Sequence, residues 1–211
     1  MILEIVLFAV SSFLVGLSGA LVPGPMLTVT ISNSLEKGPI AGPLVVAGHI
    51  IAEIAILLLL VLGLGWLIGS SAASLLISTI GGLVLIFMGY RISQSSPPSL
   101  QDPVKGPGKY GSMLGGILSS ISNPYFYIWW VTIGWAFVLQ GLEFAGLAGI
   151  LGFMVGHWAA DLGFYSLVSF FTSKGSDIIS QKYYKPLMYG CGIFMIGLGV
   201  YFVLSAQVGA L

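Results

Sequence analysis

The chain has 211 residues, of which 57% are hydrophobic and only 7% are charged, and its formal net charge is zero. Soluble domains carry about 25% charged residues, so this composition excludes a soluble globular protein and indicates an integral membrane protein. The neutral charge balance argues against a nucleic-acid partner, and the single cysteine, Cys191, excludes an internal disulfide.

Six hydrophobic segments predict an all-α protein with six transmembrane helices. The segments do not alternate apolar and polar residues, as the strands of a membrane barrel do. A single span needs about 20 residues, and the first segment is longer and contains Pro23-Gly24-Pro25. The fourth contains Asn123-Pro124. Because proline disrupts a helix interior but suits a first turn, both helices are predicted to break there. The segments are 3–35, 40–68, 72–92, 112–139, 142–170 and 186–208.

The two helix breaks are candidate substrate-binding elements. The new half-helices are expected to start at Met26 and at Pro124, the second with Asn123 as its N-cap. Free N–H groups and the positive dipole end of each half-helix would suit a carboxylate. The alternative is a pair of proline kinks without a ligand. The candidate substrate-binding residues are Pro23, Gly24, Pro25, Asn123, Pro124 and Tyr125.

An aromatic-rich run follows the second break. Two interpretations stay open: these rings form an apolar or cation-accepting wall for a substrate, or they face lipid. The rings belong to Tyr125, Phe126, Tyr127, Trp129 and Trp130.

The only two histidines stand in matching hexamers, GHIIAE at 48–53 and GHWAAD at 156–161. The i, i+4 spacing places His49 beside Glu53 and His157 beside Asp161 on one helix face each. An acidic group at the bilayer centre costs roughly 2.5–3.5 kcal/mol, so both acids should face the bundle interior or a wet cavity. Such a pair can exchange a proton near neutral pH, which makes the four residues candidates for proton coupling. The alternative is a structural hydrogen-bond pair.

The two halves of the chain match each other. Pro25 corresponds to Pro124, the first hexamer to the second, and GGLVLIFMG at 81–89 to CGIFMIGLG at 191–199. Three spans per half is an odd number, so the second half must insert upside down, as in the inverted repeats of secondary transporters. The predicted organisation is a first repeat at 1–92, a cytoplasmic Pro-rich linker at 93–111 and a second repeat at 112–211.

All seven lysines and arginines fall in or beside the first, third and fifth connections between segments. With six crossings these connections share one side of the membrane. The positive-inside rule makes that side cytoplasmic and predicts that both termini are external.

The order and spacing of the motifs resemble the lysine exporter (LysE/RhtB) family. The first-span Pro-Gly-Pro stands in LVPGPML, followed by a short polar turn and a Gly-rich second span in EKGPIAGPLVVAGH. The third span ends in IFMGYRIS, the fourth carries Asn-Pro in SISNPYF, and the fifth carries Asp161. The resemblance covers nearly the whole chain.

The resemblance implies a proton-driven exporter of amino acids or similar small metabolites in the prokaryotic cytoplasmic membrane. Tyr125 stands where the family often has a lysine, and His49, Glu53 and His157 lie outside its usual pattern. These departures point to a different substrate or coupling chemistry. The positions that match the family are Pro23, Gly24, Pro25, Asn123, Pro124 and Asp161.

Three functions are compatible with the sequence. In the first, a proton-coupled exporter binds an amino acid carboxylate at the helix breaks and its ammonium, or a proton, at Glu53 or Asp161. In the second, a divalent-cation exporter uses His49, Glu53, His157 and Asp161 as ligands. The third is a membrane protein without transport activity. An enzyme is not expected, since no Ser–His–Asp set or HExxH motif is visible. No cofactor is expected, and a homodimer is compatible with the sequence.

Overall fold

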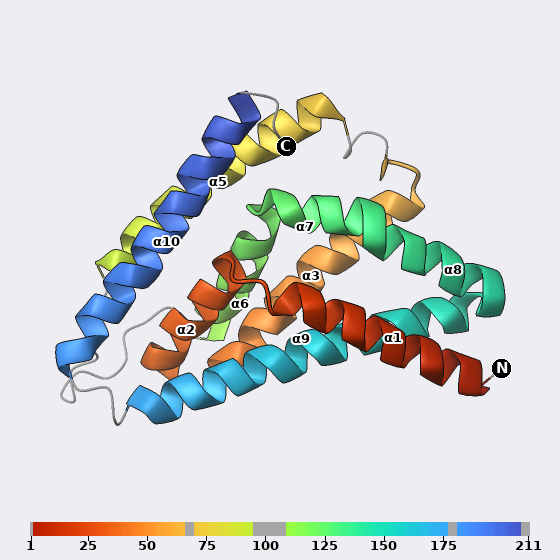
Figure 1. The fold of residues 1–211 in the computed structure, drawn as a ribbon, viewed down its shortest axis with the longest axis horizontal. Helices are drawn as coiled ribbons and strands as arrows, with labels where there is room; N and C mark the ends of the chain where they lie inside the picture. Colours follow the sequence, from red (N-terminus) through yellow and green to blue (C-terminus); the bar gives the residue numbers. More distant parts are fainter. Residues whose placement is uncertain (1, 66–69, 95–108, 177–180, 208–211) are drawn as a thin grey trace.

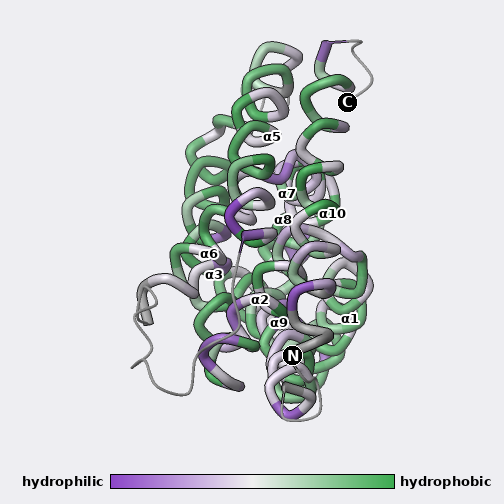
Figure 2. The backbone as a smooth tube through the Cα atoms, turned by 90° about the vertical axis from the view of Figure 1, so that its left-hand side faces the viewer, coloured by the Kyte–Doolittle hydropathy of each residue, from purple (hydrophilic) through white to green (hydrophobic). Residues whose placement is uncertain are grey.

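The computed structural model describes residues 2–65, 70–94, 109–176 and 181–207. Every regular element in these ranges is a helix, and six helices are long and apolar enough to cross a membrane (Figure 1). Figure 2 shows hydrophobic residues along most of the length of the paired helices α5 (Ser71–Ser93) and α10 (Gln181–Gln207). The predicted all-α, six-span membrane architecture is confirmed.

The first predicted helix is broken where the prolines stand. Helix α1 (Ile2–Ala20) ends before Pro23, and α2 (Pro25–Lys37) starts at the second proline with Gly24 as its N-cap. The proline at the first position of α2 has no N–H to leave unpaired and is preset for a helix. The second span is α3 (Ala41–Val61).

The fourth helix is broken in the same manner. Helix α6 (Lys109–Ile121) ends three residues before Pro124, which starts α7 (Pro124–Trp129). A π-helical turn, η1 (Trp130–Gly134), joins α7 to α8 (Trp135–Ala145), and α9 (Leu147–Ser176) follows. Most of the predicted linker at 93–111 lies outside the described residues.

The boundary between the fourth and fifth spans differs from the prediction. The sequence placed it near residues 139–142, but α8 continues to Ala145 and turns at Gly146, whose φ is 61°. A left-handed conformation at this value favours glycine and ends the helix within one residue. No polar turn residue marks the site, because the surrounding GLEFAGLAG is almost wholly apolar.

The helices pack mainly as three pairs: α1 with α9, α3 with α6, and α5 with α10. Glycines allow all three pairs to approach closely. A Cβ on Gly48 of α3 would overlap the carbonyl oxygen of Met113 in α6, and a Cβ on Gly156 of α9 would overlap that of Ala9 in α1. The glycine that precedes each histidine is therefore explained by helix packing.

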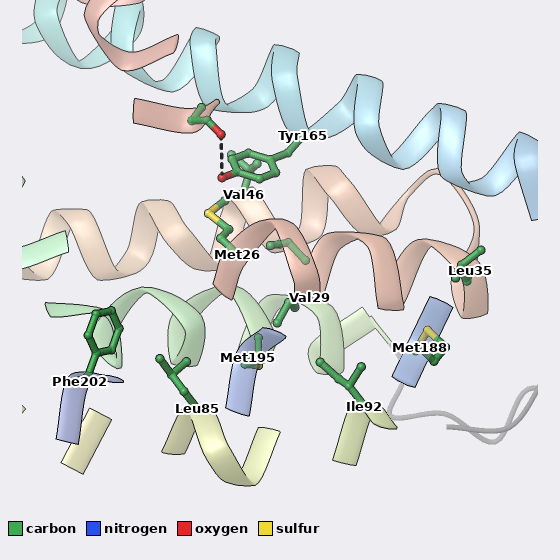
Figure 3. Packing of buried hydrophobic residues seen from close by; sticks show 12 residues of the cluster. Met26, Val29, Leu35, Val46, Leu85, Ile92, Tyr165, Met188, Met195 and Phe202 are labelled. Atoms are coloured by element: carbon green, nitrogen blue, oxygen red, sulfur yellow. Dashed lines mark hydrogen bonds between the residues drawn. The ribbon is translucent and has the colours of Figure 1, made fainter. Parts of the chain in front are cut away.

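The short helix α2 lies inside the bundle. Its residues Met26 and Val29 join a buried cluster with Leu85 of α5 and Met195 of α10 (Figure 3). In the same view the hydroxyl of Tyr165 in α9 donates to the carbonyl of Ala20, the last residue of α1, at 3.5 Å. These contacts hold both sides of the first break in the protein interior.

Candidate functional site

A cavity of about 620 Å³ lies between the two helix breaks. Its volume falls within the range of about 300–1,000 Å³ typical of small-molecule sites. Most of its walls are apolar, and the polar exceptions include Asn123 and the two histidines and two acids of the hexamers. The predicted site residues that line it are Pro23, Gly24, Pro25, His49, Glu53, Asn123, Tyr125, His157 and Asp161; Pro124 is buried directly between Asn123 and Tyr125.

The two half-helix starts differ in how their backbone N–H groups are satisfied. Gly24 has an extended backbone and offers no side-chain cap to α2. At α7 the Asn123 side-chain oxygen accepts a hydrogen bond from the Tyr125 N–H at 3.1 Å, as predicted for an N-cap. The start of α2 therefore keeps more of its first-turn donors available to a ligand.

His49, Glu53, His157 and Asp161 meet in one cluster, with one ligand atom from each lying within 4.8 Å of the others. The shortest contact crosses between the helices: His157 Nε2 lies 2.7 Å from Glu53 Oε1. Within each hexamer the separations are longer, 3.2 Å from His49 Nε2 to Glu53 Oε1 and 3.5 Å from His157 Nε2 to Asp161 Oδ2. The structure thus joins the two sequence pairs into a single site centred on Glu53.

Both carboxylate oxygens of Glu53 have partners. Its side chain is 1% exposed, and its second oxygen, Oε2, accepts the indole N–H of Trp158 at 2.8 Å. A buried carboxylate needs such partners, because an unpaired charge in a low-dielectric interior is strongly unfavourable.

The two histidines have different neighbours at Nδ1. His49 Nδ1 lies 2.6 Å from the hydroxyl of Ser120 in α6. His157 Nδ1 is buried and has no hydrogen-bond partner among the described residues. Gly16 of α1 stands beside it, so close that an added Cβ would lie 2.8 Å from this nitrogen.

Aromatic rings surround His157. Trp129 stacks on the imidazole with ring centroids 4.7 Å apart, and Phe153 stacks on it at 5.9 Å. Trp129 immediately precedes the π-helical turn, a feature often found at functional sites. Of the five rings predicted to form a wall, Tyr127 alone does not line the cavity; its hydroxyl donates to the carbonyl of Ile121 instead.

The sequence did not reveal Ser120, Gly16 or Trp158 as parts of the site. Ser120 and Gly16 lie on helices far from the hexamers in the chain, and serines and glycines are common throughout it. Trp158 stands inside the second hexamer, but its indole reaches across to Glu53 of the other half. A single sequence carries no signal for such contacts between helices.

The breaks of the first and fourth helices and the two acid-bearing spans line one cavity. A sequence model of the LysE type translocator family matches residues 17–206. The chain belongs to the LysE type translocator family. Comparisons with curated proteins and with solved structures gave no match.

Members of the LysE type translocator family are membrane transporters of amino acids or related metabolites. For this LysE type translocator, the match covers all four hexamer residues and both helix breaks. The protein is therefore a multi-pass membrane transporter, in agreement with the expectation that it is not an enzyme.

Proposed function

We propose that the protein is a proton-coupled exporter of amino acids or related small metabolites. One observation carries the proposal: a single cavity is lined both by the two helix breaks and by the buried His–Glu–His–Asp cluster. Transporter sites are commonly built in this way, from discontinuous helices near the middle of the membrane.

The cavity offers separate partners for the two charges of an amino acid. The uncapped start of α2, at Gly24 and Pro25, supplies backbone N–H groups and a positive dipole end for a carboxylate. Asp161 is 4% exposed and lines the same cavity, where it can receive an ammonium group. Asn123 and Tyr125 line the same cavity, with the buried Pro124 between them in the chain.

The cluster supplies groups that can bind and release a proton. Imidazole changes its charge within the physiological pH range, and a carboxylate beside it stabilises the protonated form. All four side chains line the cavity, and His49 is the most exposed of them, at 14%. Proton uptake here would be linked to substrate release, because both share one site.

We propose further that residues 1–92 and 112–211 are inverted repeats joined by a linker at 93–111. The reciprocal helix contacts support this: α1 packs on α9 as α6 packs on α3. Between α5 and α10, Gly82 faces the carbonyl of Gly199, and Gly192 faces that of Gly89. The repeat alignment exchanges these two glycine pairs. Rocking of one repeat against the other would then open the cavity to either side in turn.

We propose that the protein lies in the prokaryotic cytoplasmic membrane with both termini outside. The C-terminal ends of α2, α5 and α9 lie toward one end of the bundle (left in Figure 1), and the N-terminus and the α8–α9 turn lie toward the other. The lysine- and arginine-bearing connections follow the first group of ends, which the positive-inside rule assigns to the cytoplasm.

Transport by purified protein in lipid vesicles tests the proposal. Vesicles loaded with a panel of amino acids and related metabolites are given a pH gradient, and efflux is followed with and without a protonophore. We expect efflux of at least one solute that rises with the gradient and falls when the protonophore dissipates it. Efflux at the same rate with and without the pH gradient would contradict proton coupling. Retention of every solute in the panel would contradict export.

Substrate analogues separate the two proposed contacts. An amino acid amide lacks the carboxylate, and a desamino acid lacks the ammonium. If the α2 start and Asp161 bind these groups, neither analogue should compete with a transported amino acid. An amino acid that keeps both charged groups and has a side chain one methyl group shorter or longer should still compete. Competition by the amide as strong as by the parent amino acid would remove the role of the α2 start.

A further inference from the structure

We propose that the cluster is also a binding site for a divalent transition metal, with His49, Glu53 and Asp161 as its three ligands and His157 as a positioning residue. This site goes beyond the proposed export function. It would take a zinc-class cation, with the fourth coordination position facing the cavity.

The separations between the candidate ligand atoms fit a metal of this class. Zinc binds imidazole nitrogen and carboxylate oxygen at about 2.0–2.2 Å, so two ligands of a tetrahedral ion lie about 3.3–3.5 Å apart. His49 Nε2 lies 3.2 Å from Glu53 Oε1 and 3.8 Å from Asp161 Oδ2. The pair with Glu53 thus stands at ligand spacing and the pair with Asp161 a few tenths of an ångström beyond it, and one ligand atom from each of the three residues lies within 4.8 Å of the others.

Ser120 orients His49 for this role. The Ser120 hydroxyl donates to the carbonyl of Gly116 at 2.7 Å, which leaves its oxygen to accept the Nδ1–H of His49 at 2.6 Å. With the proton on Nδ1, the lone pair of Nε2 points at Glu53 and Asp161. Metal-binding histidines almost always have such a partner on the other ring nitrogen.

His157 lacks that arrangement. Its Nε2 lies 2.7 Å from Glu53 Oε1, a hydrogen-bond length that is too short for two ligands of one metal. As a ligand through Nε2 it would have to carry its proton on Nδ1, where the described part of the chain offers no acceptor. His157 therefore donates Nε2–H to Glu53 and holds that carboxylate in place.

Asp161 provides the independent sign of a missing ligand. It is 4% exposed, yet its Oδ2 accepts no hydrogen bond from the residues that the structure describes. Buried carboxylate oxygens are normally paired. Asp161 also lines the cavity, so a cation entering from that space would meet a carboxylate oxygen that accepts no hydrogen bond from the described residues.

The donor set selects among metals. One imidazole with two carboxylates suits zinc, cobalt and similar divalent ions, whereas calcium and magnesium prefer six or more oxygen ligands. The chain has only two histidines and one cysteine, so few other sites compete for such a metal.

Titration of the purified full-length protein with Co²⁺ tests the site, with a purification tag that contains no histidine. Visible absorption bands report Co²⁺ bound to nitrogen and oxygen ligands. We expect saturation at one Co²⁺ per chain, displacement by Zn²⁺, and no displacement by Ca²⁺ or Mg²⁺. The absence of saturable Co²⁺ binding would overturn the proposal.

Four variants assign the roles. H49Q should abolish Co²⁺ binding, and S120A should weaken it about 10- to 100-fold, the usual cost of losing a partner behind a ligand. H157Q should keep binding within about tenfold of the wild type, because glutamine retains an N–H donor for Glu53. E143Q changes an exposed carboxylate on α8 and should bind like the wild type.

Size-exclusion elution of each variant shows that it remains folded, and the mild S120A change preserves the test if H49Q misfolds. Binding by H49Q equal to the wild type overturns the site, and abolition by H157Q in a folded protein overturns the three-ligand assignment. Export is measured separately, in the presence of a chelator. Export without Co²⁺ binding would overturn this inference alone, and Co²⁺ binding without export would overturn the proposed function alone.

Discussion

The two halves of the site carry the same sequence motif in different surroundings. In the first half, His49 on α3 rests against Ser120 of α6. In the second, His157 on α9 rests against Gly16 of α1. One imidazole therefore has a hydroxyl oxygen that accepts its Nδ1–H, and the other faces a glycine, which offers no side-chain partner.

This difference separates the roles of two histidines that look equivalent in sequence. The Ser120 oxygen accepts Nδ1–H whether His49 Nε2 carries a proton or binds a cation, so His49 can change its protonation or ligation state without leaving Nδ1 unpaired. A change at His157 would bury an N–H with no acceptor among the described residues, which costs about 1–3 kcal/mol. His157 is thus suited to a fixed role as a donor to Glu53.

The largest expected effect comes from Glu53, which both halves share. E53Q should lower the free energy of unfolding by about 3–5 kcal/mol, the usual cost of removing one member of a buried ion pair. Export should fall to background, because glutamine keeps only one acceptor oxygen for the two donors His157 and Trp158 and removes the charge that faces His49. Thermal unfolding in detergent and vesicle efflux measure the two effects.

Two further variants calibrate that result. D161N should abolish export at a smaller cost in stability, since Asp161 Oδ2 accepts no hydrogen bond within the described ranges. E143Q alters an exposed glutamate and should change stability by less than about 0.5 kcal/mol. If E53Q unfolds no more easily than E143Q, Glu53 is not the centre that joins the halves.

Most of the fold was predictable because lipid imposes strong rules. Apolar length gives the spans, and proline gives the breaks at Pro25 and Pro124. The turn at Gly146 was not predicted, because a single glycine among apolar neighbours does not distinguish a turn from a continuing helix. The helix breaks could be predicted because proline imposes them, whereas a turn that depends on the backbone conformation of one glycine could not.

The site was predictable only as far as one helix reaches. The i, i+4 rule placed each histidine beside its acid, as the 3.2 Å and 3.5 Å separations show. The shortest contact, from His157 to Glu53, crosses between α9 and α3, and the contact from Ser120 crosses between α6 and α3. Helix pairing decides these contacts, and no residue pattern within one segment encodes it.

An intermediate effect is expected from the glycine that precedes His157. G156A places a methyl group against the carbonyl of Ala9, so α1 must shift, at a cost of about 1–3 kcal/mol for overpacking. Export should also fall, because α1 carries Gly16 and leads to the first break. The free energy of unfolding and efflux are measured as for Glu53.

Gly163 provides a matched control on the same helix. A Cβ there would meet no atom within 4 Å, so G163A should be neutral or more stable by up to about 1 kcal/mol, as alanine is the better helix former. Equal destabilisation by both variants would mean that close approach of α1 and α9 is not what Gly156 provides.

The smallest effect tests the comparison between the histidines most directly. S120A removes the partner of His49 Nδ1 and should cost about 0.5–1.5 kcal/mol of unfolding free energy, with a partial loss of export. S119A is the control: Ser119 is buried, lines the same cavity and donates to the same Gly116 carbonyl, at 3.1 Å.

The expected order of export is wild type and S119A together, then S120A, with S120T recovering activity because threonine keeps the hydroxyl. Equal export by S119A and S120A would show that the Ser120 hydroxyl serves only its hydrogen bond to Gly116 within α6 and does not support His49. In that case Ser120 would no longer distinguish His49 from His157, whose Nδ1 already functions beside a glycine, and the unequal roles of the two hexamers would lose their physical basis.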